Sequence, residues 1–534
     1  MSLFLTEEQK AAGAVNFHEA VGRHGLTRRD FMKGMLAAGA ALPVSAAAYF
    51  GYEKLHGNPV KAGLIGTGDE GGVLVGNHSP DYIKFIGVAD IRPSNMDRIF
   101  KGEGKPPRLG LEKMYGKETA HKETVKYDDY KKLLENKDIE MVVIALPLHL
   151  HAPVAIDAMR AGKHVLCEKL MAWNVSQCKE MIKVADETNR ILSIGHQRHY
   201  SLLYAHAVEV MRSGELGDVK HIRALWHRNN ALPKLDKDGK PIVDANGMPV
   251  LRDGWKPDIK AEDRARLEAD IRKHGYKSME ELVRWRLFNR TGGGLMAELG
   301  SHQLDACSIF LGKVHPLAVT GVGGKMFYHD DREIDDHVFT TFEFPGKDYF
   351  ADKEHTAVKD KNDIVVVNYS SINTNSFEPY GECVMGSRAS MVVLEEKDVM
   401  LYPERGALAQ KATAVSVSAG GGGKPALDSS GSTGALAPSA VGQAAIGPIS
   451  RGYTEEMDHF AYCVRMHQKA ANREEQKKWE HEPRCHGRVA MPDAIVALTS
   501  NLAMKRRERI EFKPEWFEAD SKDVPDAEMK PEIV

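Results

Sequence analysis

The fold is decided by the stretch from Pro59 to Gly71, which reads PVKAGLIGTGDEG. Its first half is a short apolar run of the kind found in buried strands, and its second half is a G-x-G-x-x-G pattern made by Gly66, Gly68 and Gly71. Glycine at these positions leaves room for a tight turn and for a pyrophosphate at the start of the next helix. An ordinary capped turn would also contain glycines, so the flanking sequence has to separate the two explanations.

The next predicted strand, from Tyr82 to Ala89, ends at an acidic residue. Asp90 lies 19 residues after Gly71, which is the spacing of the carboxylate that binds the adenosine ribose in dinucleotide-binding folds. A carboxylate here would repel a 2′-phosphate and therefore favours NAD over NADP. Arg92 weakens this preference because a nearby arginine accommodates a 2′-phosphate, so NADP remains the alternative.

Strands and helices alternate beyond this point. The continuous apolar run from Glu140 to Leu146 is typical of a buried parallel strand. Further elements are expected as a helix over 152–160, a strand over 164–167, a helix over 175–187 and a strand over 191–195. This order predicts an α/β Rossmann domain with a doubly wound parallel sheet over residues 59–200. Ligands of such sheets bind beyond the carboxyl ends of the strands.

The composition excludes several classes of protein. The chain has 534 residues, of which 42% are hydrophobic and 28% are charged, as in an ordinary globular protein. A net charge of −3, from 72 basic and 75 acidic residues, argues against nonspecific nucleic-acid binding. The 6 cysteines contain no C-x-x-C metal motif and are too few for a disulfide scaffold. We expect no metal site, and buried thiols with at most one structural disulfide.

The N-terminal region resembles an export signal. The sequence TRRDFMK at 27–33 precedes an uncharged, Ala-rich stretch over 34–52, a pattern similar to twin-arginine signals. Three alanines at 46–48 offer a small-residue cleavage site, and a membrane anchor is the alternative, disfavoured by Pro43. We expect residues 1–48 to be a signal segment that binds the twin-arginine translocase, and the protein to be periplasmic or otherwise exported.

Four segments occur in order along the chain: GLIGTG at 63–68, LPLHLHAP at 146–153, AGKHVLCEKL at 161–170 and GGGLMAELGSHQLD at 292–305. Together they resemble the Gfo/Idh/MocA oxidoreductases, the family of glucose–fructose oxidoreductase and inositol dehydrogenase. The resemblance implies a second, α+β domain over residues 201–510. Its open, mainly antiparallel sheet is expected to carry the substrate site and to form homo-oligomers, as dimers or tetramers.

The resemblance also implies the catalytic residues. Lys169 matches the active-site lysine of the family's E-K-P motif, and His302 matches its catalytic histidine. Glu298 stands where the family usually has Asp, and is expected to orient His302 or to bind a substrate hydroxyl. A desolvated lysine can relay a hydroxyl proton, and histidine is an acid or base at neutral pH. A solvated polar stripe on a helix is the alternative explanation for Glu298 and His302.

The ends of the other predicted strands supply the remaining candidates. The cofactor-binding candidates are Gly66, Gly68, Gly71, Asp90, Arg92, Pro147, His151 and Glu168. The substrate-binding candidates are Gln197, Arg198, Tyr200, Trp226, His227, Arg228 and Asp305. The cluster from Trp226 to Asn230 suits a sugar, because an aromatic ring stacks on the sugar while polar groups donate hydrogen bonds. Packing and capping are the alternatives for this cluster and for His151, and Trp285 with Arg286 is expected to face the same cleft.

Three functions are compatible with these residues. We expect an exported NAD(P)-dependent oxidoreductase that transfers hydride to or from a sugar, polyol or glycoside and holds its cofactor tightly. The alternative is an NAD-dependent glycosidase that oxidises, eliminates, hydrates and reduces its substrate without net redox change. A non-catalytic cofactor-binding protein is the second alternative. A charged insertion at 232–277 is expected as a lid or surface excursion, and the Ala/Gly/Ser-rich stretch at 407–448 as a flexible loop.

Overall fold

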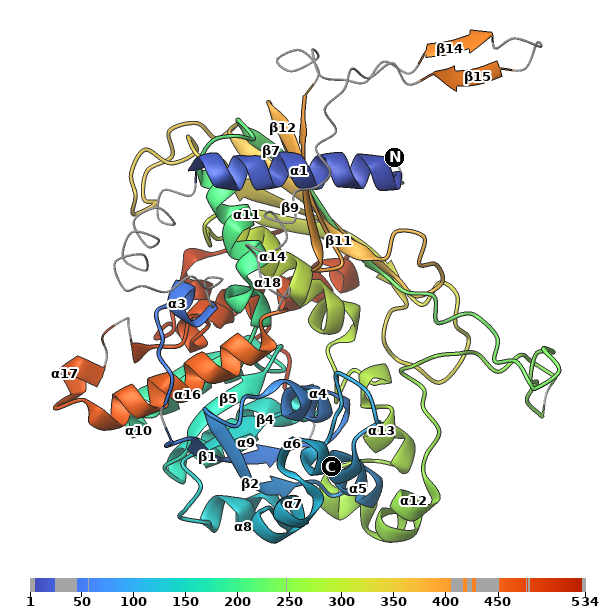
Figure 1. Cartoon of the computed structure of the whole chain (residues 1–534), viewed down its shortest axis with the longest axis vertical. Coiled ribbons are helices and arrows are strands. Elements are labelled where there is room, and N and C mark those ends of the chain that lie inside the picture. The colour runs from blue at the N-terminus through green and yellow to red at the C-terminus, as the bar shows by residue number, and fades with distance from the viewer. Residues whose placement is uncertain are drawn as a thin grey trace.

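Two sheets organise the chain, one in each of two domains (Figure 1). The computed structural model describes residues 5–24, 46–55, 57–245, 247–404, 416–419, 425–428, 451–476, 478 and 481–530. The twin-arginine-like motif at 27–33 lies outside these residues, as does most of 407–448. Within the latter stretch, β14 (Ser416–Ala419) pairs with β15 (Pro425–Asp428).

The first domain is a six-stranded parallel sheet in the order β3-β2-β1-β4-β5-β6. Its strands are β1 (Val60–Ile65), β2 (Ile83–Ala89), β3 (Val125–Tyr127), β4 (Met141–Ile144), β5 (His164–Glu168) and β6 (Leu192–Gly195). The strands read as apolar runs because both faces of the sheet are buried against helices. The strand order reverses between β1 and β4, which is where such sheets bind their ligands. The predicted Rossmann fold is confirmed.

Two separate apolar cores cover the two faces of this sheet. Helices α9 (His151–Arg160) and α10 (Val175–Thr188) pack on one face. Helices α4 (Asp69–Asn77), α5 (Pro93–Lys101) and α16 (Tyr453–Lys469) pack on the other. Shorter helices α6 (Leu111–Tyr115), α7 (Lys117–Glu123) and α8 (Tyr130–Glu135) complete the domain. Helix α16 comes from the far end of the chain, so the C-terminal part returns to the cofactor domain (Figure 1).

The second domain contains an eight-stranded sheet in the order β13-β12-β11-β7-β10-β9-β8-β16. The strands are β7 (Val219–His227), β8 (Ala318–Gly324), β9 (His337–Pro345), β10 (Ile364–Ile372), β11 (Tyr380–Gly386), β12 (Ala389–Leu394), β13 (Asp398–Pro403) and β16 (Ile510–Glu511). Only the central pair β7–β10 is parallel, which confirms the mainly antiparallel sheet. Helices α11 (Leu202–Arg212), α14 (Ser301–Phe310) and α18 (Gly487–Arg506) pack on this sheet.

The charged insertion leaves the second domain and returns to the first. Residues 229–258 run in extended segments joined by isolated bridges, and helices α12 (Ala261–Leu267) and α13 (Met279–Val283) follow. The carboxylate of Asp263 accepts hydrogen bonds from Arg92 Nε at 2.9 Å and from the backbone N–H of Ser94 at 2.9 Å. Figure 1 shows α12 beside α5. The insertion therefore links the second domain to the ribose-binding side of the first.

The N-terminal helix α1 (Glu7–His24) packs against β13 and α11. Asn16 Nδ2 donates to the backbone carbonyl of Leu401 at 3.1 Å, and Tyr402 Oη donates to the carbonyl of Gln9 at 3.0 Å. Phe17 is buried at 4% exposure. Residues that the sequence assigns to the signal segment thus take part in the folded second domain. Among the described residues, no helix is long and apolar enough to cross a bilayer.

Replacing Phe17 by Ala is expected to destabilise the second domain by about 3 kcal/mol, because a buried aromatic ring leaves a cavity when it is removed. The matched control is Val15→Ala on the same helix, where the valine is 46% exposed. The two variants should be compared by thermal unfolding followed by circular dichroism. Equal melting temperatures for both variants and the parent chain would show that α1 adds nothing to stability.

Candidate active site

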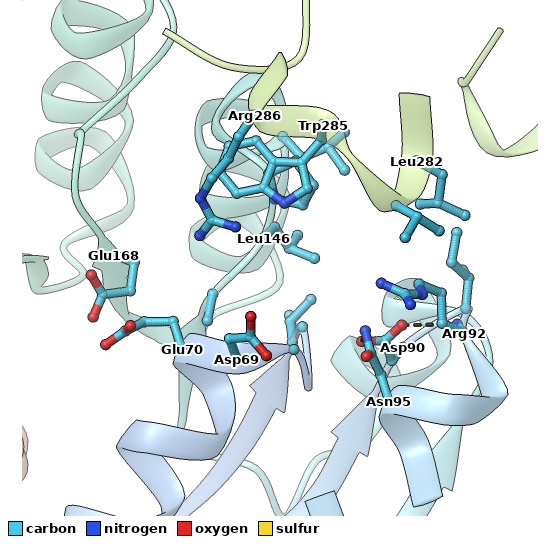
Figure 2. Close-up of a pocket in the computed structure, with 18 of the residues that line it drawn as sticks. Asp69, Glu70, Asp90, Arg92, Asn95, Leu146, Glu168, Leu282, Trp285 and Arg286 are labelled. Atoms are coloured by element: carbon cyan, nitrogen blue, oxygen red, sulfur yellow. Dashed lines mark hydrogen bonds between the residues drawn. The ribbon is translucent and has the colours of Figure 1, made fainter. Parts of the chain in front are cut away.

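A cavity of about 1220 Å³ lies beyond the carboxyl ends of the parallel strands. Its wall combines the β1–α4 turn, the residues after β4 and β5, the end of β7, the insertion and the start of α16. Figure 2 shows Asp69, Glu70, Asp90 and Glu168 on one side, with Trp285 and Arg286 on the other. The volume exceeds that of a typical single-ligand pocket, so a dinucleotide and a small substrate can share it.

The glycine turn is shaped to receive a dinucleotide. Gly66 has a φ of +92°, and a Cβ there would lie 2.3 Å from the carbonyl oxygen of Ala145. Gly68 lines the cavity, and the nearest atom to a Cβ built on it is Asn95 Nδ2 at 3.8 Å. A side chain at Gly68 would therefore fill the space beside the first turn of α4, where a pyrophosphate binds in this fold. The residues present fit such a cofactor.

Hydrogen bonds of Asp90 connect the glycine turn to the residues that follow β2. Its Oδ2 accepts hydrogen bonds from the N–H of Thr67 at 2.8 Å and from Asn95 Nδ2 at 3.2 Å. Its Oδ1 accepts from the backbone N–H of Arg92 at 2.8 Å (Figure 2). The guanidinium of Arg92 is bonded to Asp263 from the insertion. Asp90 and Arg92 both line the cavity, with the arginine held by a residue 171 positions away.

Lys169 and Glu298 lie together at the other end of the cavity. Lys169 Nζ donates to the backbone carbonyl of Glu298 at 2.8 Å. The carboxylate of Glu298 accepts from Arg286 Nε at 2.6 Å, so its partner is Arg286 and not His302. Burial lowers the pKa of the Lys169 amine from its ordinary value, although the charge of Glu298 opposes this shift. Burial alone would raise the pKa of Glu298, but the charges of Arg286 and Lys169 hold it below its usual value.

His302 borders the same cavity from the start of α14. Residues 296–300 form a π-helical turn before α14 begins at Ser301, a wider turn that is common at functional sites. Burial, with the nearby charge of Lys169, holds the pKa of His302 well below its ordinary value, so the imidazole is neutral at pH 7. Its buried Nδ1 has no hydrogen-bond partner among the described residues. A neutral imidazole with a free nitrogen is an acceptor for a proton.

Two buried carboxyl groups face each other beside Lys169. Glu70 and Glu168 lie close together at the edge of the cavity (Figure 2), and the Oε1 atom of each lacks a partner within the described part of the chain. Burial raises the pKa of Glu70, and burial with the neighbouring charge of Glu70 raises the pKa of Glu168 well above its usual value. A carboxyl group whose pKa is raised keeps its proton to a higher pH, and in the protonated form it can donate a hydrogen bond.

A third cluster lies behind the site and already contains a cation. His196, Asp305 and Asp493 bring ligand atoms within 4.8 Å of one another, which is close enough for a metal ion. Lys313 Nζ, however, donates to Asp493 at 2.8 Å and to Asp305 at 3.2 Å. The ammonium group of Lys313 therefore offsets one of the two carboxylate charges. Across the described residues, which include all six cysteines, each thiol is buried and unpaired.

The structure brings most of the predicted site residues to one cavity. Those that line it are Gly66, Gly68, Asp90, Arg92, Pro147, His151, Glu168, Lys169, Trp226, Arg228, Glu298 and His302. Those that do not line it are Gly71, Gln197, Arg198, Tyr200, His227 and Asp305. Both ring nitrogens of His151 lie 2.8 Å from backbone carbonyl oxygens, Nδ1 from that of Leu170 and Nε2 from that of Leu146, so the ring contacts the loop that carries Lys169.

The residues outside the cavity have partners elsewhere. Arg198 is fully buried and pairs with Glu382 at 2.8 Å and with Glu396 at 2.7 Å. Other predicted residues also form hydrogen bonds away from the cavity. Tyr200 Oη accepts from the N–H of Arg484, and the His227 ring forms a hydrogen bond with Ser370. Asp305 forms hydrogen bonds with His199 and Lys313. Gly71 packs under the carbonyl of Gly66, and Gln197 is buried. These polar groups stabilise the core behind the site.

Sequence reasoning missed several residues of the cavity wall. Tyr276 comes from the charged insertion, while Arg451 and Tyr453 follow the Ala/Gly/Ser-rich stretch. Asp263, also from the insertion, does not line the cavity but holds Arg92, which does. Arg451 Nε bonds Glu396 at 2.9 Å and so places the start of α16 against the cavity. Nothing in the local sequence of Arg451 signals this position, because it depends on how α16 packs on the first domain.

Helix α16 carries a buried acid whose protonation affects stability. Burial, with the charges of Glu455 and Asp81, raises the pKa of Asp458 to about 8, whereas the unfolded chain releases this proton near the ordinary value of 3.8. Between these values the folded state holds more protons, so Asp458 makes the protein less stable as pH rises. Asp458→Asn is therefore expected to gain stability over the parent by up to about 1.4 kcal/mol per pH unit across this window. Melting temperatures at pH 5 and pH 8 test this.

The exposed Asp520 provides a control of the same chemistry, because Asp520→Asn also replaces a carboxyl by an amide. Its effect on the melting temperature should not change between pH 5 and pH 8. A gain for Asp458→Asn that is the same at both pH values would contradict a buried, protonated Asp458.

A glycine turn at the switch point of a parallel sheet, with a lysine and a histidine beside the same cavity, fits a dinucleotide-binding Rossmann fold. Two family models match the chain: the oxidoreductase family with an NAD-binding Rossmann fold over residues 60–196, and the GFO/IDH/MocA C-terminal domain over residues 267–352. Residues 60–196 and 267–352 are therefore similar to the two domains of Gfo/Idh/MocA oxidoreductases, the resemblance that the sequence motifs predicted.

Curated relatives with different activities resemble parts of the chain. Inositol 2-dehydrogenase of Salmonella typhimurium is 31% identical over 109 residues, 20% of this chain and 32% of that protein. A glycosyl hydrolase family 109 protein of Stenotrophomonas maltophilia is 28% identical over 256 residues, 47% of this chain and 52% of that protein. The matches thus span between a third and about half of the length of these relatives.

Solved structures show the same fold at low identity. An aldose–aldose oxidoreductase from Caulobacter crescentus is similar over 85% of this chain and 100% of that one, with 17% identity and a TM-score of 0.51. A WlbA dehydrogenase from Bordetella pertussis, solved with NADH and UDP-GlcNAcA, covers 85% of this chain and 99% of that one, with 12% identity and a TM-score of 0.52.

Proposed function

We propose that this protein is an NAD(P)-dependent oxidoreductase that transfers hydride to or from a carbon bearing a hydroxyl group in a sugar, polyol or glycoside. The observation that carries the proposal is that Lys169 and His302 line the same cavity as the glycine turn at Gly66 and Gly68. The nicotinamide, when bound, supplies the hydride acceptor or donor. The residues of the chain bind the sugar and move the hydroxyl proton.

His302 takes the role of the base. Its neutral imidazole, with an unpartnered Nδ1, accepts the proton of the substrate hydroxyl as the carbon is oxidised and returns it in the reverse direction. Lys169 is held in place by its bond to the Glu298 carbonyl, and its remaining N–H groups donate to the substrate oxygen. Trp226 provides an apolar wall for the sugar ring.

For the cofactor we propose NAD in preference to NADP, held through many turnovers. Asp90 places a negative charge beside the ribose position, and Arg92 is bonded to Asp263 instead of being free to bind a 2′-phosphate. The insertion covers this side of the cavity. Protein purified without added nucleotide should release NAD on denaturation, as measured by mass spectrometry of the supernatant. Release of NADP, or of no nucleotide, would contradict this assignment.

The activity is tested by two incubations of the purified protein. Oxidation of an aldose coupled to reduction of a ketose, followed by product chromatography, is expected for the oxidoreductase.

The second candidate is a redox-neutral glycosidase, which the matched glycosyl hydrolase family 109 protein favours. Burial raises the pKa of the carboxyl groups of Glu70 and Glu168 beside Lys169, which would suit an acid for the leaving group. Aglycone release from aryl glycosides without net NADH would select this candidate.

We also propose export through the twin-arginine translocase to the periplasm, supported by the TRRDFMK motif at 27–33. Replacing Arg28 and Arg29 by Lys should retain the protein in the cytoplasmic fraction if this route is used.

We further propose a homo-oligomer built on the second sheet, where Val322 and Phe339 are 62% and 42% exposed. Sedimentation of the parent and of Phe339→Asp tests this, since a monomeric parent would contradict it.

A further inference from the structure

The charge of one arginine in the cavity is not balanced by the protein. Arg228 follows β7 and lines the cavity, where its guanidinium lies 5.1 Å from the ring centroid of Trp226. Among the described residues, no group accepts a hydrogen bond from this guanidinium and no carboxylate forms an ion pair with it. Burial and the neighbouring charge of Arg286 lower the pKa of Arg228, which is the expected response of a cation in an unfavourable position.

The other arginines at this end of the cavity have acid partners. Arg286 Nε donates to Glu298 at 2.6 Å, and Arg451 Nε donates to Glu396 at 2.9 Å. Burial raises the pKa of the remaining acids nearby, Glu70 and Glu168, and neither carboxyl group forms an ion pair with Arg228. Unlike Arg286 and Arg451, Arg228 therefore has no paired carboxylate among the described residues.

A guanidinium removed from water costs free energy unless an acceptor replaces the lost hydration. Its planar array of N–H donors matches the two oxygens of a carboxylate or a sulfate, and such charge-assisted pairs are about twice as strong as neutral hydrogen bonds. A neutral sugar hydroxyl would satisfy one donor but would leave the charge unbalanced. The arrangement at Arg228 thus selects for an anionic group on the ligand.

Arg228 and His302 both lie close enough to Trp226 for one sugar to contact both. The ring of Trp226 lies 5.5 Å from that of His302, centroid to centroid, so the same indole borders both His302 and Arg228. Tyr380 stacks on this indole at 4.5 Å between ring centroids and Arg228 lies over the ring, so a pyranose would lie against the indole edge, with one substituent toward Arg228 and a hydroxyl toward His302. We propose that the substrate is an acidic sugar, a uronic acid or a sulfated sugar, whose anionic group binds Arg228. This inference rests on the proposed function for the identity of the reacting hydroxyl.

Equilibrium binding to the full chain, loaded with NAD, tests the inference without requiring turnover. Calorimetry should compare acidic and neutral partners of the same stereochemistry: D-glucuronate with D-glucose, D-galacturonate with D-galactose, and D-glucose 6-sulfate with D-glucose. At least one acidic ligand is expected to bind about tenfold more tightly than its neutral partner, and the preferred pair distinguishes carboxylate from sulfate. Arg228→Gln should abolish this preference, and Arg228→Lys should retain part of it.

Arg223 provides the matched control, because it lies on β7, the strand that Arg228 follows, and is ion-paired with Glu378 outside this cavity. Arg223→Gln removes the same charge and should keep the preference for the acidic sugar. Equal affinities for all three pairs, or an unchanged preference in Arg228→Gln, would overturn the inference. If the chain holds no nucleotide, the proposed function fails, and the same titrations on the nucleotide-free chain still decide whether Arg228 selects an anion.

Discussion

Lys169→Met is expected to lower kcat by about 10²–10⁴-fold, the range that a positioned proton-transfer group contributes. The lysine reaches the cavity through its bond to the Glu298 carbonyl, and no other amine in the described residues shares this position. Methionine keeps much of the length and apolar volume of the side chain but cannot donate or relay a proton. The loss should therefore appear in kcat and not in cofactor content, which is measured by nucleotide release.

The control is Lys54→Met, because Lys54 is exposed, lies near Asp81 and does not line the cavity. It should keep full activity and cofactor content. His302→Asn is expected to lower kcat to a similar extent, and the double variant should be little worse than either single variant if both residues act on the same proton. Full activity in Lys169→Met would place the chemistry at a different site.

The second large effect is expected from Gly68→Val, which should weaken NAD binding by about 100-fold, or about 2.7 kcal/mol. Gly68 has a φ of −71°, a backbone conformation open to any residue, and a Cβ there contacts nothing closer than 3.8 Å. The fold should therefore tolerate valine, while its methyl groups occupy the pyrophosphate position. Nucleotide content after purification and titration of the nucleotide-free protein with NADH, followed by fluorescence, measure the loss.

Thermal unfolding of nucleotide-free Gly68→Val separates this effect from misfolding, since its melting temperature should match that of the nucleotide-free parent. Gly66→Ala is a contrasting variant. A Cβ at Gly66 meets a backbone carbonyl at 2.3 Å and the φ is +92°, so this change should lower the melting temperature itself. Normal NAD affinity in a folded Gly68→Val would mean that the pyrophosphate does not lie on this turn.

The Rossmann sheet was predictable because its signals are local. The apolar run before Gly66, the glycine spacing and the acid at Asp90 each depend on a few neighbouring residues, and the strands at 83–89 and 141–144 fall close to the expected ranges. The cavity position of Lys169 followed from its place after β5, since ligands meet the carboxyl ends of parallel strands. The family resemblance then supplied His302.

The roles of several polar residues were not predictable because they depend on distant partners. Arg198 follows β6 and has a typical binding side chain, yet Glu382 and Glu396 from the second sheet occupy its guanidinium. Glu298 lies four residues before His302, but Arg286 takes its carboxylate. The tertiary fold decides which acids lie near an arginine and therefore whether the arginine forms an ion pair. Arg228 forms none within the described residues.

The contact between Asp263 and Arg92 has a consequence for kinetics. Because this ion pair joins the insertion to the first domain beside Asp90, we expect a bound dinucleotide to dissociate only after Asp263 and Arg92 separate. If the ion pair separates less often than the enzyme turns over, the cofactor stays bound between reactions. The substrate that is oxidised and the substrate that is reduced must then bind one after the other at the same site. Initial-rate plots at several acceptor concentrations would then be parallel lines, the pattern of a ping-pong reaction.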